Sequence, residues 1–369
     1  MMLEYYFPNE VAEPLLWHPV LFAYTLLVSG ADLLILAALA YLSGSLRKAI
    51  PLMTMLGIGF FAVVLAGPLA DLRSPQRAAL IFTRPHIAAT AANPGISLTA
   101  FQSIAWLVAL VLSVIFALLT FSYYSHQASL TSSGFRRTIY QAFSLGVTTS
   151  ERYGSVEKAA KVVAVLMLPF LTLWGIYPAS LFIMQTWNPA WRSWALLPVT
   201  YFADTFVVAT ALFMLVYFLW RYGGLERDVV VPILKIHAAG SLSVAALTGL
   251  QMAMWWSWSP GTAEMVSPLI PLMYLVIALL LLSFFLSLVA MRYPATIPVV
   301  ALVAMAGTFT NKWNIIVNAQ LISKTGLAFL EAELGGLWVL ETAAPIALGI
   351  AVFILLSMIF PLEVREGGK

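Results

Sequence analysis

The sequence predicts an all-α polytopic membrane protein with about nine transmembrane helices, within a range of eight to ten. Of its 369 residues, 62% belong to the set Ala, Val, Ile, Leu, Met, Phe, Trp, Tyr and Cys, and only 9% are charged. A soluble domain carries about 25% charged residues because its surface must face water. A single globular core of this length could not hide so much apolar surface. The third observation is that the apolar residues gather in long stretches, so lipid is the solvent for most of the chain.

Nine segments are long and apolar enough to cross a bilayer, since a spanning helix needs roughly 20 mainly apolar residues. They are 18–42, 49–69, 99–122, 159–183, 194–220, 229–256, 265–291, 297–318 and 341–361. The seventh carries no charge from Met265 to Met291, whereas polar side chains crowd the end of the eighth, from Asn311 to Asn318. Long connections are expected at 70–98, 123–158 and 319–340.

The distribution of basic residues predicts the orientation. With nine spans, twelve Lys and Arg residues fall on one side of the membrane and six on the other, with Lys312 among the six. Cytoplasmic loops carry the excess of Lys and Arg. We therefore expect a multi-pass protein of the cell (inner or cytoplasmic) membrane, with its N-terminus outside and its C-terminus in the cytoplasm. The N-terminal segment carries Glu4, Glu10 and Glu13 and no basic residue, which is not typical of a signal peptide.

Spans one and five begin alike. The first has HPV at 18–20 followed by Tyr24, and the fifth has LPV at 197–199 followed by Tyr201. Internal repeats are common in membrane proteins. This similarity predicts two four-helix bundles, at 1–183 and 184–318, followed by an outer segment and a C-terminal transmembrane helix at 319–369.

Of the ionisable residues inside predicted spans, three are candidates for moving protons. Asp32 lies near the middle of span one, Asp204 near the middle of span five, and His237 in the inner third of span six. Ionisable groups inside a membrane are costly, and their default interpretation is functional. A carboxyl group there can carry protons. The alternative is a structural polar contact between helices, worth about 0.6–2 kcal/mol.

The residue inventory excludes several kinds of site. Without cysteine the chain can form no disulfide, no ordinary iron–sulfur cluster and no C-x-x-C-H haem attachment. Its four histidines do not pair on one helix, so we expect no haem, and there is no metal-binding cluster and no nucleotide-binding motif. We also expect no nucleic-acid partner. Redox chemistry would have to come from a partner subunit or from a dissolved cofactor.

Aromatic and ionisable side chains converge at the predicted outer mouth of the first bundle. They are Trp17, His18, Tyr24, Asp71, Arg73, Trp174 and Tyr177. A quinone head group needs hydrogen-bond donors at its carbonyls, a proton-exchanging side chain and an apolar slot for its tail. Histidine and tyrosine meet the first two needs. The alternative is an interfacial aromatic belt, to which Trp191 and Trp255 would also belong.

Several short motifs, in the right order, resemble the NrfD/PsrC family of polysulfide-reductase-type membrane subunits. The segment DLRSPQR at 71–77, followed by Arg84-Pro85 and by Asn93-Pro94, is similar to the outer loop of that family. WHP at 17–19 resembles its first span. NKWNIIVNAQ at 311–320 looks like the R-W-N-x-x-x-G-G-Q element of the branch found with sulfite-reductase-linked and heterodisulfide-reductase-like complexes. Tyr177 stands where a histidine is common in the family.

The resemblance implies a cofactor-free quinol-oxidising or quinone-reducing anchor subunit of a respiratory complex. Such a subunit would bind menaquinone or another quinone near the outer face, beneath a ferredoxin-like iron–sulfur subunit and further catalytic subunits. It implies His18, Tyr24 and Tyr177 as reacting residues, with Trp17, Asp71, Arg73 and Trp174 around the quinone. Asp32, Asp204 and His237 would be candidates for moving protons. The terminal substrate stays open among polysulfide, tetrathionate, dimethyl sulfoxide, nitrite and a heterodisulfide.

Two other functions compete with this interpretation. A proton-coupled secondary transporter would use Asp32 and Asp204 as coupling carboxylates, and a purely structural anchor would have lost its quinone site. A neighbouring gene for a four-cluster ferredoxin protein would favour the respiratory subunit.

Overall fold

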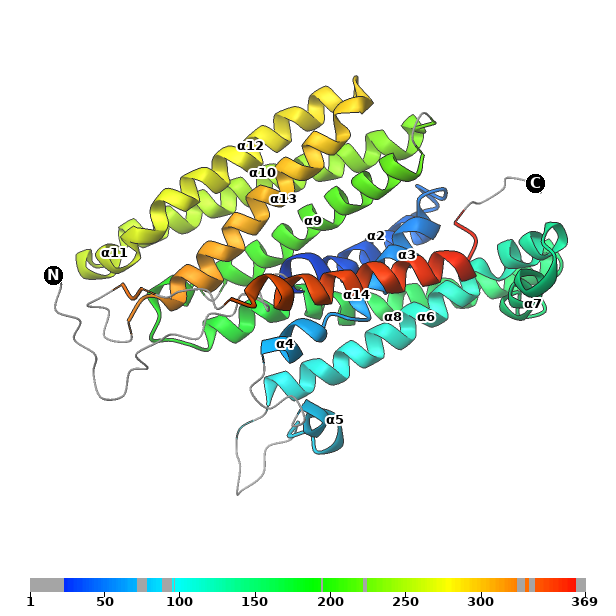
Figure 1. Cartoon of the computed structure of the whole chain (residues 1–369), viewed down its shortest axis with the longest axis horizontal. Coiled ribbons are helices and arrows are strands. Elements are labelled where there is room, and N and C mark those ends of the chain that lie inside the picture. The colour runs from blue at the N-terminus through cyan, green and yellow to red at the C-terminus, as the bar shows by residue number, and fades with distance from the viewer. Residues whose placement is uncertain are drawn as a thin grey trace.

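The structure, a computed structural model, describes residues 23–71, 78–87, 95, 97–193, 195–221, 224–323, 329–331 and 336–362. These residues form long helices that run roughly along one axis (Figure 1). Within them the β-structure is limited to an isolated bridge between Ile322 and Phe329. Eight helices are long and apolar enough to cross a membrane. The predicted fold class, an all-α polytopic membrane protein, is therefore confirmed.

The first half of the chain folds into η1 and helices α2 to α8. Their bounds are η1 Ala23–Leu27, α2 Ser29–Ser43, α3 Ile50–Phe61, α4 Ala66–Asp71, α5 Leu80–Thr83, α6 Leu98–Thr131, α7 Gly134–Phe143 and α8 Ser150–Ile183. The 34-residue helices α6 and α8 are about 50 Å long, which exceeds the roughly 30 Å hydrocarbon core. Much of the connection expected at 123–158 is therefore helical.

The second half contains the remaining long helices. Their bounds are η3 Pro189–Trp191, α9 Leu196–Trp220, α10 Arg227–Ser257, α11 Pro260–Val266, η4 Ser267–Leu269, α12 Ile270–Ala290, η5 Pro294–Thr296, α13 Ile297–Lys312, η6 Trp313–Asn318 and α14 Trp338–Ile359. Eight of the nine predicted segments correspond to the eight candidate spans.

The second predicted span, 49–69, is not one helix. It divides into α3 and α4, with a turn at 62–65 between them. Proline at position 68 lacks an N–H, so the carbonyl of Val64 loses its helical partner, which favours a break here. The indole nitrogen of Trp106 donates a hydrogen bond of 2.9 Å to the carbonyl of Phe61, the last residue of α3. The interruption is therefore stabilised from α6, and it brings α4 to the end of the first bundle.

The helices pack in two groups of four. Helices α2, α3, α6 and α8 contact one another, as do α9, α10, α12 and α13. Helices α2 and α8 both pack on α9, which joins the groups, and α14 packs on α3 (Figure 1). Gly30 permits α2 and α3 to approach closely, because a Cβ atom there would lie 2.6 Å from the Gly57 carbonyl oxygen. The two groups and the added C-terminal helix match the predicted architecture.

Three residues expected at the membrane surface are instead in the interior. Trp191 is 2% exposed and Trp255 is fully buried, so neither belongs to an interfacial belt. Lys312, which was counted with the outer basic residues, is also fully buried, at the end of α13. Its removal from the outer set leaves five basic residues on that side against twelve, so the expected orientation is unchanged.

Candidate functional site

The structure describes only part of the predicted quinone site. Trp174 and Tyr177 lie on α8, and both are buried. Trp17, His18 and Arg73 lie outside the described residues, and so do the side chains of Tyr24 and Asp71. The described part of the site consists of α8 and the helices that face it.

A cavity of about 280 Å³ lies beside Trp174 and Tyr177, at the α4–α5 end of the first bundle. It is lined by Leu65, Leu69, Ala78, Ala79, Ile81, Phe82, Thr99, Ser103, Trp174 and Tyr177. Most of these side chains are apolar, with three hydroxyl groups among them. The volume is close to the lower end of the roughly 300–1,000 Å³ typical of ligand pockets. Its size and lining suit a mainly apolar ring with a few hydrogen-bonding atoms.

Trp174 is held rigidly in the cavity wall. Its indole nitrogen donates a hydrogen bond of 3.1 Å to the carbonyl of Gln102 on α6. Its ring meets Phe61 edge-on, with 5.8 Å between the ring centroids, and lies 5.6 Å from the ring of Tyr177. Because its N–H is already engaged, Trp174 offers a ligand ring surface rather than a hydrogen bond.

Tyr177 presents the polar group best placed for a ligand. It follows Trp174 by three residues, which puts both side chains on one face of α8. Its hydroxyl oxygen is buried and has no hydrogen-bond partner of normal geometry among the described residues. Thr99, which also lines the cavity, is near enough to interact with it. A buried hydroxyl without a partner costs about 1–3 kcal/mol, so a bound molecule that completes this hydrogen bond would be favoured.

The rim of the cavity is apolar and exposed. Leu69 and Phe82 are each 41% exposed. In a protein surrounded by lipid, such side chains face acyl chains. A ligand with a long hydrocarbon tail could therefore occupy the cavity with its ring and leave its tail in the bilayer.

A second group of polar residues lies where the two bundles meet. Asp32 on α2, Asp204 on α9 and Lys312 on α13 are all fully buried. The ammonium group of Lys312 interacts electrostatically with both carboxyl groups and lies 5.2 Å from the centre of the Tyr201 ring. Asn311 donates a hydrogen bond of 3.2 Å to Asp204. The predicted intramembrane carboxyl groups thus share one buried cation.

Lys312 was not among the predicted site residues, because it was counted with the outer basic residues although it lies in the second half of predicted span eight. The available signal was the run of polar residues at 311–318 within an otherwise apolar segment. The structure shows that η6 at 313–318 is a π-helix, a rare conformation that is frequent at functional sites. The indole nitrogen of Trp191 donates a hydrogen bond of 2.7 Å to the carbonyl of Ile315 in this element. The side-chain amide of Asn188 donates a hydrogen bond of 2.7 Å to the carbonyl of Ala319, just after it.

The carboxyl cluster and the cavity are joined through α8. A Cβ atom on Gly175 would lie 3.4 Å from a carboxylate oxygen of Asp32 and 2.4 Å from the ring of Phe202. Gly175 directly follows Trp174, which lines the cavity. Only glycine leaves space here for Asp32 and Phe202 to approach α8. The first bundle therefore places Asp32 close behind the cavity wall.

His237 forms a separate polar group in the second bundle. Its Nδ1 atom is 2.7 Å from the Thr210 hydroxyl, and its Nε2 atom is 3.0 Å from the Ser283 hydroxyl. Thr210 follows Asp204 by six residues, or about 9 Å along α9. His237 is therefore one or two helical turns from the carboxyl cluster, with both ring nitrogens hydrogen-bonded. Over the described ranges, no group of three His, Cys, Asp or Glu residues is placed to hold a metal ion.

Comparison with known proteins identifies a close relative. The chain is 44% identical over 360 residues to a subunit of the tetrathionate reductase of Archaeoglobus fulgidus, and the match covers 97% of this chain and 96% of the relative. No family model matches the sequence. The bd oxidase structure from Geobacillus thermodenitrificans aligns with 94% of this chain and 99% of that chain, at 11% identity and a TM-score of 0.43, which is too low to support an inference.

Proposed function

We propose that this chain, which belongs to the NrfD/PsrC family of integral membrane subunits, is the quinone-reactive anchor of a respiratory reductase complex. The observation that carries the proposal is the apolar cavity of about 280 Å³ with the buried hydroxyl of Tyr177 in its wall. Since the relative belongs to a tetrathionate reductase, we propose tetrathionate or a similar sulfur compound as the terminal substrate of the complex.

The lining of the cavity fits menaquinone or another quinone. The apolar side chains of α4 and α5 would enclose the ring, and the exposed rim at Leu69 and Phe82 would let the tail enter the lipid. A bound quinone supplies a carrier of two electrons and two protons. The Tyr177 hydroxyl would hydrogen-bond one carbonyl oxygen and hold a proton there, and the Thr99 hydroxyl provides a further donor. The Ser103 hydroxyl already donates to the carbonyl of Thr99, so it could only accept a hydrogen bond from the ligand. The ring of Trp174 would exclude water from the inner wall.

Electrons would pass between this cavity and a partner subunit. Because the sequence contains no cysteine, the iron–sulfur clusters would belong to that partner, a ferredoxin-like protein docked on the outer face near α4 and α5. His18, Tyr24, Asp71 and Arg73 are the further quinone-site candidates implied by the family. Further catalytic subunits would complete the complex.

Protons would be exchanged through the buried polar groups. Asp32 approaches α8 next to Trp174. The ammonium group of Lys312 interacts electrostatically with both Asp32 and Asp204. These residues would take up and release protons as the quinone reacts, with His237 as a candidate further along the second bundle. This role would make the reaction proton-translocating.

The proposal is tested by Tyr177→Phe in the purified complex, with a water-soluble quinol as electron donor. The loss of one hydrogen bond worth about 0.5–1.5 kcal/mol predicts a fall in kcat/KM of roughly 2- to 12-fold. The control is Tyr274→Phe, which removes a hydroxyl from an exposed tyrosine on α12 and should leave kcat/KM unchanged. Equal turnover in the wild type and Tyr177→Phe would rule out this site assignment.

A further inference from the structure

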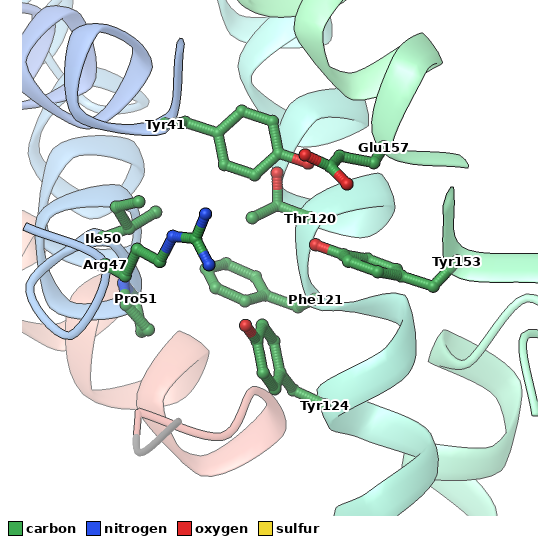
Figure 2. Close-up of a pocket in the computed structure, with 9 residues that line it drawn as sticks. All are labelled: Tyr41, Arg47, Ile50, Pro51, Thr120, Phe121, Tyr124, Tyr153 and Glu157. Carbon is green, nitrogen blue, oxygen red and sulfur yellow. The ribbon is translucent and has the colours of Figure 1, made fainter. Parts of the chain in front are cut away.

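A second cavity, of about 100 Å³, lies at the opposite end of the first bundle. Helix α3 begins at this cavity and ends at Phe61, next to the quinone cavity. Its walls come from α2, the α2–α3 turn, α3, α6 and α8. The lining residues are Tyr41, Arg47, Ile50, Pro51, Thr120, Phe121, Tyr124, Tyr153 and Glu157 (Figure 2). None of them takes part in the proposed quinone chemistry.

Hydrogen-bond donors are concentrated in this cavity. Figure 2 shows the guanidinium group of Arg47 directed into the space beside Tyr41 and Phe121. The hydroxyls of Tyr41 and Thr120 are buried and have no hydrogen-bond partner of normal geometry within the described part of the chain. Thr120 is only 2% exposed, and Tyr153 lies within interaction range of Tyr41. A space of this size holds several water molecules or one small polar group. The hydroxyls in its walls can donate hydrogen bonds to an acceptor bound there.

The charge of the cavity favours an anion. Among the lining residues, Glu157 is the one that carries a carboxylate. A carboxylate oxygen of Glu157 lies 2.9 Å from the ammonium nitrogen of Lys161, one turn further along α8, so its charge is already paired. Arg47 forms no ion pair with another described residue. The start of α3 at Ile50 also borders the cavity, and the N-terminal end of a helix carries a partial positive charge. The positive charge of Arg47 is therefore the one charge of the lining residues that is not balanced by an ion pair with a residue that the structure describes, and it favours a negatively charged ligand.

We propose that this cavity binds a phosphate group. Arg47 would hold two of its oxygens, because the planar guanidinium fits phosphate in a bidentate manner. The buried hydroxyls of Tyr41 and Thr120 would donate to the remaining oxygens. Arg47 is itself an exposed residue, which leaves the cavity open on that side. The phosphate can come from a phospholipid head group, which basic pockets between transmembrane helices bind, or from free phosphate, and the chemistry of recognition is the same.

The test uses the purified full-length chain in a mild detergent after extensive washing. Three probes are titrated: dioctanoyl phosphatidylglycerol, dioctanoylglycerol (the same lipid without phosphate) and inorganic phosphate. Native mass spectrometry measures retained phospholipid, and thermophoresis measures Kd. We expect the phosphatidylglycerol to bind the wild type, and Arg47→Gln to weaken this binding by at least about tenfold. The control Arg136→Gln, at an exposed arginine on α7, should leave Kd unchanged.

Two further variants keep the test decisive if Arg47→Gln fails to fold. Arg47→Lys keeps the charge but loses bidentate geometry, and Tyr41→Phe removes a single hydroxyl, so both should bind the phosphatidylglycerol more weakly than the wild type does. Strong competition by inorganic phosphate would identify free phosphate as the source, and weak competition would identify the lipid head group. Equal binding of dioctanoylglycerol and the phosphatidylglycerol, or equal Kd in the Arg47 and Arg136 variants, would overturn the proposal.

Discussion

Replacement of Lys312 by methionine measures how far one buried cation supports the junction of the two bundles. Methionine has a similar length but no charge, so the change leaves Asp32 and Asp204 buried without their shared cation. Removing one partner of a buried charge pair costs about 3–5 kcal/mol. For a chain of this size that corresponds to a fall in Tm of roughly 4–7 °C. Lys312 is fully buried, so solvent screening does not reduce this effect.

The assay is thermal unfolding in detergent, followed by tryptophan fluorescence. The double variant Lys312→Met/Asp204→Asn should recover part of the lost stability. Contacting residues have coupling energies of about 0.5–3 kcal/mol, and we expect about 1–2 kcal/mol for this pair. The control is Lys235→Met, because Lys235 is exposed on α10 and should shift Tm by no more than about 1 °C. A Tm for Lys312→Met equal to that of the wild type, or a double variant less stable than either single variant, would refute the charge-balance argument.

Two other predictions follow from the close packing and from the carboxyl cluster. Gly30→Ala would place a Cβ atom 2.6 Å from the Gly57 carbonyl oxygen, so we expect a loss of about 1–3 kcal/mol in thermal unfolding; Gly261→Ala, with no neighbour within 4 Å, should be as stable as the wild type. In liposomes containing the complex, Asp204→Asn should abolish acidification coupled to quinol oxidation while electron transfer continues. The control Asp228→Asn, outside the bundle interior, should leave acidification intact, and persistent acidification in Asp204→Asn would exclude this residue from proton transfer.

The long helices were predictable because membrane helices follow from composition along the chain. The uncharged run from 265 to 291, for example, appears as α12 with its preceding turn. The interruption of the second span was harder to predict. Its segment is apolar throughout, and only the Gly67-Pro68 pair indicates that the helix must break.

The candidate site was predictable only in part. Trp174 and Tyr177 were expected at the end of span four, and three-residue spacing on one helix was enough to put them on one face. The other cavity walls, at Leu65, Phe82 and Thr99, come from three further segments. The predicted topology puts these segments at the same end of the first bundle, but no pattern in the sequence indicates that these particular side chains line one cavity.

Residue types and their order are enough to establish that this chain is helical, membrane-embedded and free of cysteine-bound cofactors. Its similarity to one relative adds the family. Which polar groups meet depends instead on how the helices pack. Asp32, Asp204 and Lys312 come from positions far apart in the chain, and they share one buried cluster because α2, α9 and α13 pack at the junction of the bundles. Helical periodicity assigns a side chain to a face of its own helix, whereas the register between helices decides which side chain it contacts.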